Sequence, residues 1–107
     1  MLTQMASRRE KLEAMLVDDP LDQTLRYMLA MELEKEAEHN RSLELLQQLM
    51  SDESPYVPAF LMAGQQLARL QRSDEAADVY RSGIQQAQEQ GDDHAAGEMS
   101  QFLAELN

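Results

Sequence analysis

The sequence repeats itself with a period of 34 residues, and this repetition constrains the fold more than any other feature. Small or apolar residues recur at matching positions: Ala30 aligns with Gly64, Leu33 with Leu67, Ser42 with Ala76, Leu46 with Tyr80, and Leu49 with Gly83. Two antiparallel helices with short turns need about 34 residues. The repetition therefore favours a stack of helical hairpins over a bundle of unrelated helices.

Helix-forming residues dominate the chain, whereas the β-branched residues typical of strands are scarce. Proline, glycine and polar clusters interrupt the pattern at five places, which predicts six helices joined by short turns. The expected ranges are 3–17, 22–37, 41–51, 56–70, 74–89 and 93–106. Asn40 and Ser73 are expected to be N-caps, as is Asp92 or Asp93.

The second copy of the repeat resembles the tetratricopeptide repeat (TPR) family, whose consensus runs W-x2-L-G-x2-Y, then A-x3-F, a further Ala and a closing Pro. The matching residues, in order, are Phe60, Ala63, Gly64, Leu67, Ala76, Tyr80 and Gly83. Gln88 replaces the closing proline. The first copy is degenerate, since Arg26 occupies the tryptophan position and the closing proline is displaced by one residue, to Pro55. The segment 56–60 also resembles small bacterial TPR proteins of about this length.

The resemblance implies an all-α fold, a short right-handed superhelix of TPR-type helical hairpins. It predicts a single TPR-like domain over residues 1–107, with a leading helix at 1–19, a degenerate first repeat at 20–54, a second repeat at 55–90 and a C-terminal capping helix at 91–107. The structural signature positions are Ala30, Leu33, Ser42, Leu46, Phe60, Gly64, Leu67, Ala76, Tyr80 and Gly83.

In the TPR family the first helix of each repeat lines a concave groove that binds a peptide or a helix. The positions of this chain that match the groove are Tyr27, Met31, Glu34, Lys35, Leu61, Gln65, Ala68 and Arg69. Members that hold the C-terminal carboxylate of chaperone tails carry Lys and Asn at the first two groove positions of a repeat. Here those positions hold Tyr27 and Met31 in the first repeat, so this carboxylate clamp is absent.

The charge balance limits the class of partner. Nine Lys and Arg against twenty Asp and Glu give a net charge of −11, which repels phosphate backbones and anionic lipid. Neither nucleic acid nor a membrane is therefore expected as a partner. The glutamates between Glu32 and Glu38 should steer a basic, amphipathic segment towards the apolar groove residues. The alternative is that Met31 and Leu61 belong to the core and that the glutamates only solvate one face.

No enzymatic activity and no cofactor are expected. The chain has no cysteine, and it shows no Ser-His-Asp spacing or glycine-rich phosphate loop. A metal-dependent domain is the remaining catalytic possibility, because His94 and Glu98 share one helix face at spacing i, i+4. The neighbouring aspartates at 92 and 93 are also explained by the start of a helix.

Two non-enzymatic functions remain. The leading interpretation is an adaptor or scaffold module that binds a protein or peptide in the groove. The alternative is a homo-oligomerising module, because the last predicted helix has more apolar surface than a capping helix needs. Its apolar residues are Met99, Phe102, Leu103 and Leu106. Charges interrupt the first 17 residues, so no signal peptide is expected there and a cytoplasmic location is the default.

Overall fold

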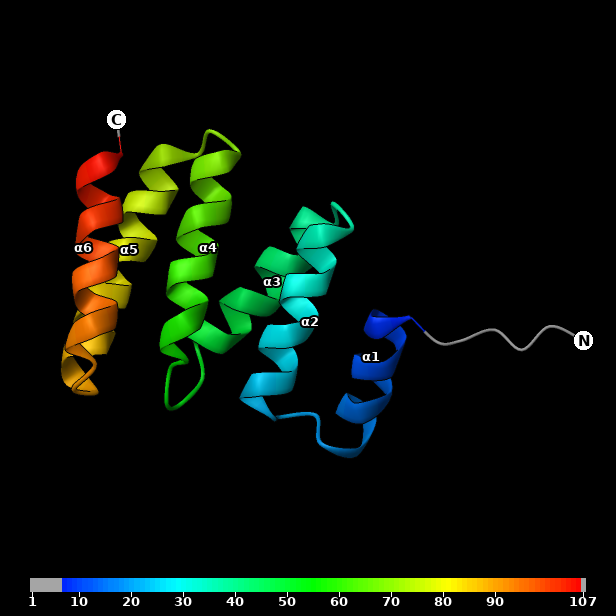
Figure 1. Cartoon of the computed structure of the whole chain (residues 1–107). Helices are drawn as coiled ribbons and strands as arrows, with labels where there is room; N and C mark the ends of the chain where they lie inside the picture. Colours follow the sequence, from blue (N-terminus) through cyan, green and yellow to red (C-terminus); the bar gives the residue numbers. More distant parts are fainter. Residues whose placement is uncertain (1–6, 107) are drawn as a thin grey trace, which may run out of the picture. The chain divides into compact units, whose positions relative to one another are not determined.

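The computed structural model describes residues 7–106, which form six helices and no strand (Figure 1). The helices are α1 (Arg8–Asp18), α2 (Gln23–Lys35), α3 (His39–Met50), α4 (Val57–Arg69), α5 (Ser73–Glu89) and α6 (Asp93–Glu105). The predicted all-α fold is confirmed, and each predicted helix is present. Within the described helices, none combines the length and the apolar character needed to cross a bilayer.

The chain divides into two compact units, and the boundary between Leu45 and Leu46 falls inside α3. The first unit contains α1, α2 and the first half of α3. The second contains the end of α3 and all of α4, α5 and α6. This boundary lies within the predicted first repeat, so the assignment of repeats to 20–54 and 55–90 within one domain stays a prediction.

In the first unit, α1 packs against α2 around a cluster of buried leucines: Leu12, Leu29 and Leu33. The start of α1 is a capping box, in which Ser7 Oγ accepts the Glu10 N–H at 3.1 Å and Glu10 accepts the Ser7 N–H at 3.2 Å. The hydrogen bond from the Ser7 N–H lowers the pKa of the Glu10 carboxyl group. The prediction of a helix from residue 3 is wrong at its start, because Ser7 is extended; positions 3–6 lie outside the described residues.

In the second unit, α5 packs against both α4 and α6, and the three helices lie side by side (Figure 1). Two glycines allow this packing. A Cβ on Gly64 would lie 2.6 Å from Cζ of Tyr80, and one on Gly83 would lie 2.6 Å from Cβ of Phe60. The Tyr80 ring also stacks on Phe102 of α6, with ring centroids 6.1 Å apart. Burial raises the pKa of Tyr80. Close helix contact therefore explains both glycines.

Three helices end in the same turn, a Schellman motif. Its left-handed residues are Ala37 (φ 62°), Gln71 (φ 63°) and Gly91 (φ 77°). In each turn the next N–H reaches back to a helix carbonyl: Glu38 to Leu33 at 2.8 Å, Arg72 to Leu67 at 2.8 Å and Asp92 to Ala87 at 2.7 Å. The motif ends α2 at Lys35, whereas the sequence predicted a helix to residue 37.

The helix starts differ from the expected N-caps at two positions. Asn40 lies within α3, which begins at His39, and Ser73 is the first residue of α5 rather than its cap. Arg72 is the N-cap of α5 and makes no side-chain cap hydrogen bond; its guanidinium instead binds Glu75 at 2.6 and 2.8 Å. This contact lowers the pKa of Glu75. The cap at Asp92 is confirmed, since its carboxylate accepts the Ala95 N–H at 3.1 Å.

The packing at Gly64 gives the first prediction. Gly64→Leu should lower the free energy of unfolding by at least about 1–3 kcal/mol, because the side chain would displace the Tyr80 ring. Gly97→Ala is the matched control, since nothing lies within 4 Å of a Cβ there. That change should raise the free energy by up to about 1 kcal/mol through helix propensity. Chemical unfolding followed by circular dichroism measures both, and equal stability of the two variants would contradict the packing.

The Schellman turns give a second prediction. Ala37→Gly and Gln71→Gly should each stabilise the fold by about 0.5–1 kcal/mol, because the strain of a left-handed residue exceeds the entropy that glycine loses on folding. Gly91→Ala should destabilise it by a similar amount. Thermal melts measure these shifts. A lower melting temperature for both glycine variants would show that residues 37 and 71 are not left-handed.

Candidate functional site

The signature positions form the interior of the two units. All ten are buried: Ala30, Leu33, Ser42, Leu46, Phe60, Gly64, Leu67, Ala76, Tyr80 and Gly83. Ser42 Oγ donates a hydrogen bond of 2.8 Å to the carbonyl of Ala30, which joins α3 to α2 within the first unit. These residues pack the helices, so a partner has to use other helix faces.

The predicted groove residues of the first unit lie together on one face of α2. Tyr27, Met31 and Glu34 follow one another at helical spacing, and Lys35 lies beside Met31. Tyr27 and Glu34 are half-buried, while Met31 is 38% exposed. Lys35 is exposed and lies 3.4 Å from the carboxylate of Glu32. An aromatic ring and a thioether therefore reach the surface of this helix.

The predicted groove residues of the second unit lie on α4. Leu61, Gln65 and Ala68 are half-buried, and Arg69 is exposed. The other faces of α4 carry buried residues. Among them are Phe60 and Gly64, which pack against α5. The two sets of residues belong to different units, and their joint action as one groove stays a prediction.

Part of the acidic run, which is expected to steer a basic segment, is paired within the first unit. Two of its glutamates bind α1: Glu32 lies 2.8 Å from Arg8, and Glu36 lies 2.8 Å from Arg9. The side chain of Glu32 is only 12% exposed. These carboxylates bind α1 within the first unit. Any preference for a basic partner therefore depends less on the acidic run than on the net charge of the whole chain.

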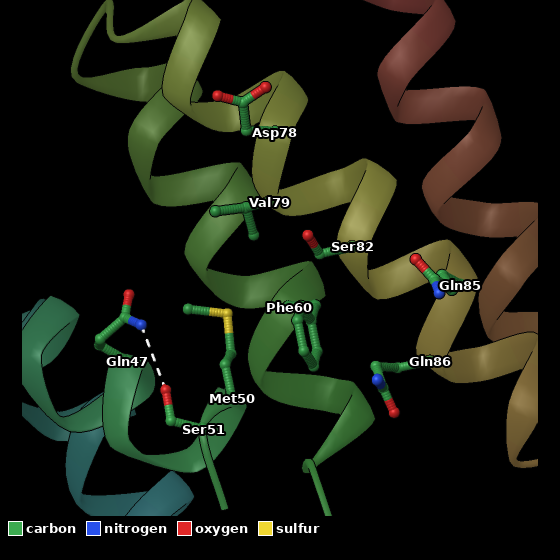
Figure 2. Close-up of a pocket in the computed structure, with 9 residues that line it drawn as sticks. All are labelled: Gln47, Met50, Ser51, Phe60, Asp78, Val79, Ser82, Gln85 and Gln86. Carbon is green, nitrogen blue, oxygen red and sulfur yellow. Dashed lines mark hydrogen bonds between the residues drawn. The ribbon is translucent and has the colours of Figure 1, made fainter.

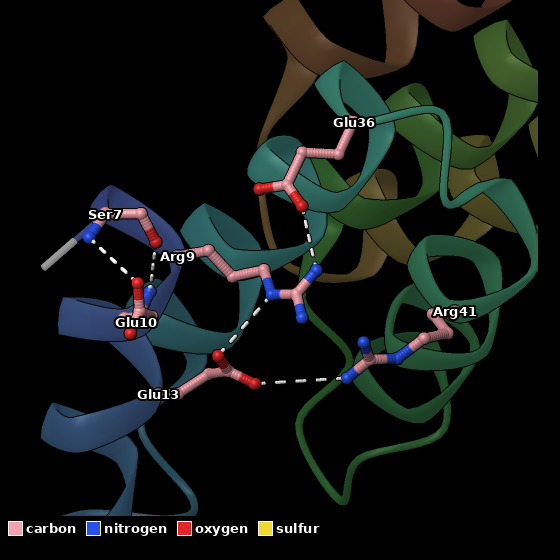
Figure 3. A network of polar contacts seen from close by, with 6 residues as sticks. All are labelled: Ser7, Arg9, Glu10, Glu13, Glu36 and Arg41. Carbon is pink, nitrogen blue, oxygen red and sulfur yellow. Dashed lines mark hydrogen bonds and ion pairs between the residues drawn. The ribbon is translucent and has the colours of Figure 1, made fainter.

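Arg9 is the centre of a network that joins three helices of the first unit (Figure 3). Its guanidinium contacts Glu36 at 2.8 Å and Glu13 at 3.5 Å, and Glu13 in turn lies 3.9 Å from Arg41 of α3. The hydrogen bond with Glu36 and the charge of that residue raise the pKa of Arg9. The network ties α1 to the end of α2 and to the start of α3.

A hollow of about 360 Å³ in the second unit was not predicted from sequence (Figure 2). It lies between the end of α3, α4 and α5, and its apolar side chains are Met50, Phe60 and Val79. Polar groups surround them: Gln47, Ser51, Asp78, Ser82, Gln85 and Gln86. Gln47 donates to Ser51 Oγ at 3.3 Å. The lining comes from separate segments and has no repeated spacing, so no local pattern in the sequence indicates it.

The remaining predicted features lie on α6. The His94 side chain is 89% exposed and lies 3.5 Å from Glu98. Among the described residues, no group of three or more His, Cys, Asp or Glu side chains could hold a metal ion. Met99 is fully buried and Phe102 stacks on Tyr80, so much of the apolar surface of this helix packs on the chain itself.

A series of six helices, three of which end in the same Schellman turn, is typical of an all-α helical repeat protein. The solution and crystal structures of a tetratricopeptide repeat domain protein from Salinibacter ruber are similar to the chain. The solution structure is 33% identical, with a TM-score of 0.75 over 79% of this chain and 86% of that one. The crystal structure is 32% identical, with a TM-score of 0.70 over 78% and 92%.

The solution structure of a protein from Bordetella parapertussis is 26% identical, with a TM-score of 0.77 over 94% of this chain and 87% of that one. No family model matches the sequence, and neither does any curated protein. The identity and coverage of the Salinibacter structures show that the chain belongs to the tetratricopeptide repeat family. Members of this family are helical repeat modules that usually mediate protein interactions.

The Arg9 network gives a third prediction. Arg9→Ala should loosen α1, so that its backbone amides exchange with solvent faster by a factor of about two to five, the range for a small network of surface ion pairs. Arg81→Ala is the control, because Arg81 pairs with Asp78 of its own helix, at 3.2 Å. Hydrogen exchange measured by NMR reports on the amides of α1 and of α5 separately. Unchanged protection of residues 8–18 in Arg9→Ala would contradict a tethering role.

Proposed function

We propose that the protein is a non-catalytic adaptor or scaffold module that binds a peptide or helix of a partner protein through the faces of α2 and α4. The observation that carries the proposal is membership of the TPR family. The family resemblance implies that the first helix of each repeat, here α2 and α4, lines the binding groove. The partly exposed Tyr27, Met31 and Leu61 support it, because aromatic, thioether and aliphatic side chains at a surface anchor a bound chain.

The partner segment is basic and amphipathic. Its apolar face contacts Tyr27 and Met31 on α2 and Leu61 on α4, and its cations are attracted by the net charge of −11. Two glutamates of the acidic run are already paired with α1, so the attraction is distributed over the surface and acts mainly on the association rate.

Selection of random peptides displayed on phage tests this proposal directly. The peptides that the purified protein retains should be rich in Lys or Arg and should carry apolar residues at helical spacing. Synthetic copies of them should bind more weakly at higher salt, because screening reduces the attraction between opposite charges. Enrichment of acidic peptides would contradict the predicted partner class.

Variants of each surface then locate the binding. Tyr27→Ala and Leu61→Ala should each weaken peptide binding by about tenfold or more, as expected for buried anchors at an interface. Ser82→Arg is the matched control, because it blocks the hollow between α3, α4 and α5 without altering either predicted face. Calorimetric titration measures all three. Loss of binding in Ser82→Arg alone would place the site in the hollow and overturn the proposed location.

A further inference from the structure

The most exposed large apolar side chains among residues 7–106 lie on α1 and in the turn that follows it. Met15 is 52% exposed, Val17 is 80% exposed and Leu21 is 78% exposed. The other face of α1 is different, since Leu12 and Leu16 pack in the leucine cluster with α2. The proposed function does not use this outward surface of α1.

Four exposed residues form a stripe along the outward face of α1: Lys11, Ala14, Met15 and Asp18. Their spacing of i, i+3, i+4 and i+7 places them in one row on a helix. Neither Lys11 nor Asp18 has an ion-pair partner among the described residues, whereas Arg8 and Arg9 on the same helix bind glutamates of α2. The stripe thus has a cation at one end, an anion at the other and apolar side chains between them.

This stripe is complementary to itself. If two copies of α1 pack antiparallel about a two-fold axis between Ala14 and Met15, Lys11 of each copy lies opposite Asp18 of the other. Ala14 then faces Met15 twice, so that a small residue accommodates a large one. The antiparallel arrangement also pairs opposite ends of the two helix dipoles. In a closed two-fold contact, both copies use the same surface and make the same interactions.

We propose that the outward face of α1 is a self-association surface, through which the protein forms an antiparallel homodimer. Lys11 and Asp18 set the register, and Met15 supplies the central apolar contact. Val17 on the same helix and Leu21 in the turn that follows it are also exposed, at 80% and 78%. This surface lies outside the α2 and α4 residues of the proposed function, so the dimer and the peptide contacts use different side chains.

The size of the surface sets the strength of the dimer. A helix of 11 residues is about 16 Å long. Two such helices bury less than about 1,200 Å² in total, which is the range of weak, reversible complexes. The dissociation constant should therefore lie between about 1 µM and 1 mM.

Sedimentation of the whole chain at concentrations from about 0.1 µM to 1 mM tests the proposal. The wild-type protein should pass from monomer to dimer. Lys11→Glu and Asp18→Lys should each weaken the dimer at least about tenfold, because each places like charges opposite one another twice. Both positions are exposed, and circular dichroism checks that the variants keep their helices.

Two combinations of the same changes restore complementarity. The double variant Lys11→Glu/Asp18→Lys keeps the net charge and reverses both pairs, so it should dimerise like wild type. An equimolar mixture of the two single variants should form a heterodimer, since their stripes are opposite in charge. Arg81→Glu on α5 controls for the change in net charge and should leave the dimer intact.

Each other outcome overturns the proposal. A wild-type chain that remains monomeric at about 1 mM shows that the stripe is not a self-association surface. A dimer that both single variants preserve uses another surface. A double variant that fails to dimerise shows that the two charges do not face one another.

Discussion

Two glycines inside helices determine how closely the helices of the second unit approach one another. Each costs about 1 kcal/mol of helix propensity, yet each leaves space that a large side chain fills. Tyr80 occupies the space over Gly64, while Phe60 and Met99 occupy the space over Gly83. Because the Tyr80 ring also stacks on Phe102, the position of α6 depends on the contact between α4 and α5. The buried contacts of α4, α5 and α6 therefore depend on one another.

The first unit is held together by different means. Its leucine cluster is small, and polar contacts supplement it at several points. Arg26 occupies the position of the TPR tryptophan; it is buried and donates to the carbonyl of Leu21 at 3.0 Å. Ion pairs from Arg8 and Arg9 hold α1 against α2. A degenerate repeat can thus keep its helices packed, although hydrogen bonds and charges replace part of the aromatic contacts.

The helix-forming residues and their interruptions predicted the helices, the repeat signature predicted the family, and the aspartates after Gly91 predicted the cap at Asp92. The sequence could not predict the features that depend on exact backbone geometry or on distant segments. Ala37 and Gln71 adopt a left-handed conformation that glycine normally signals, so the end of α2 was placed two residues too late. The contact between Arg9 and Glu36 joins residues that are 27 positions apart in the sequence, so no local sequence pattern predicts it. The hollow beside Phe60 could not be predicted for the same reason, because its lining residues come from separate segments of the chain.

The burial of Tyr80 has a spectroscopic consequence. The chain has three tyrosines and no tryptophan, and Tyr80 is the one that is fully buried; Tyr27 and Tyr56 are only partly covered. A ring held rigidly between α4 and α6 gives a near-ultraviolet dichroic signal that vanishes when the ring rotates freely. The protein therefore carries an intrinsic optical probe of tertiary packing in its second unit. Far-ultraviolet dichroism follows all the helices, so comparing the two wavelength ranges distinguishes loss of packing from loss of helix.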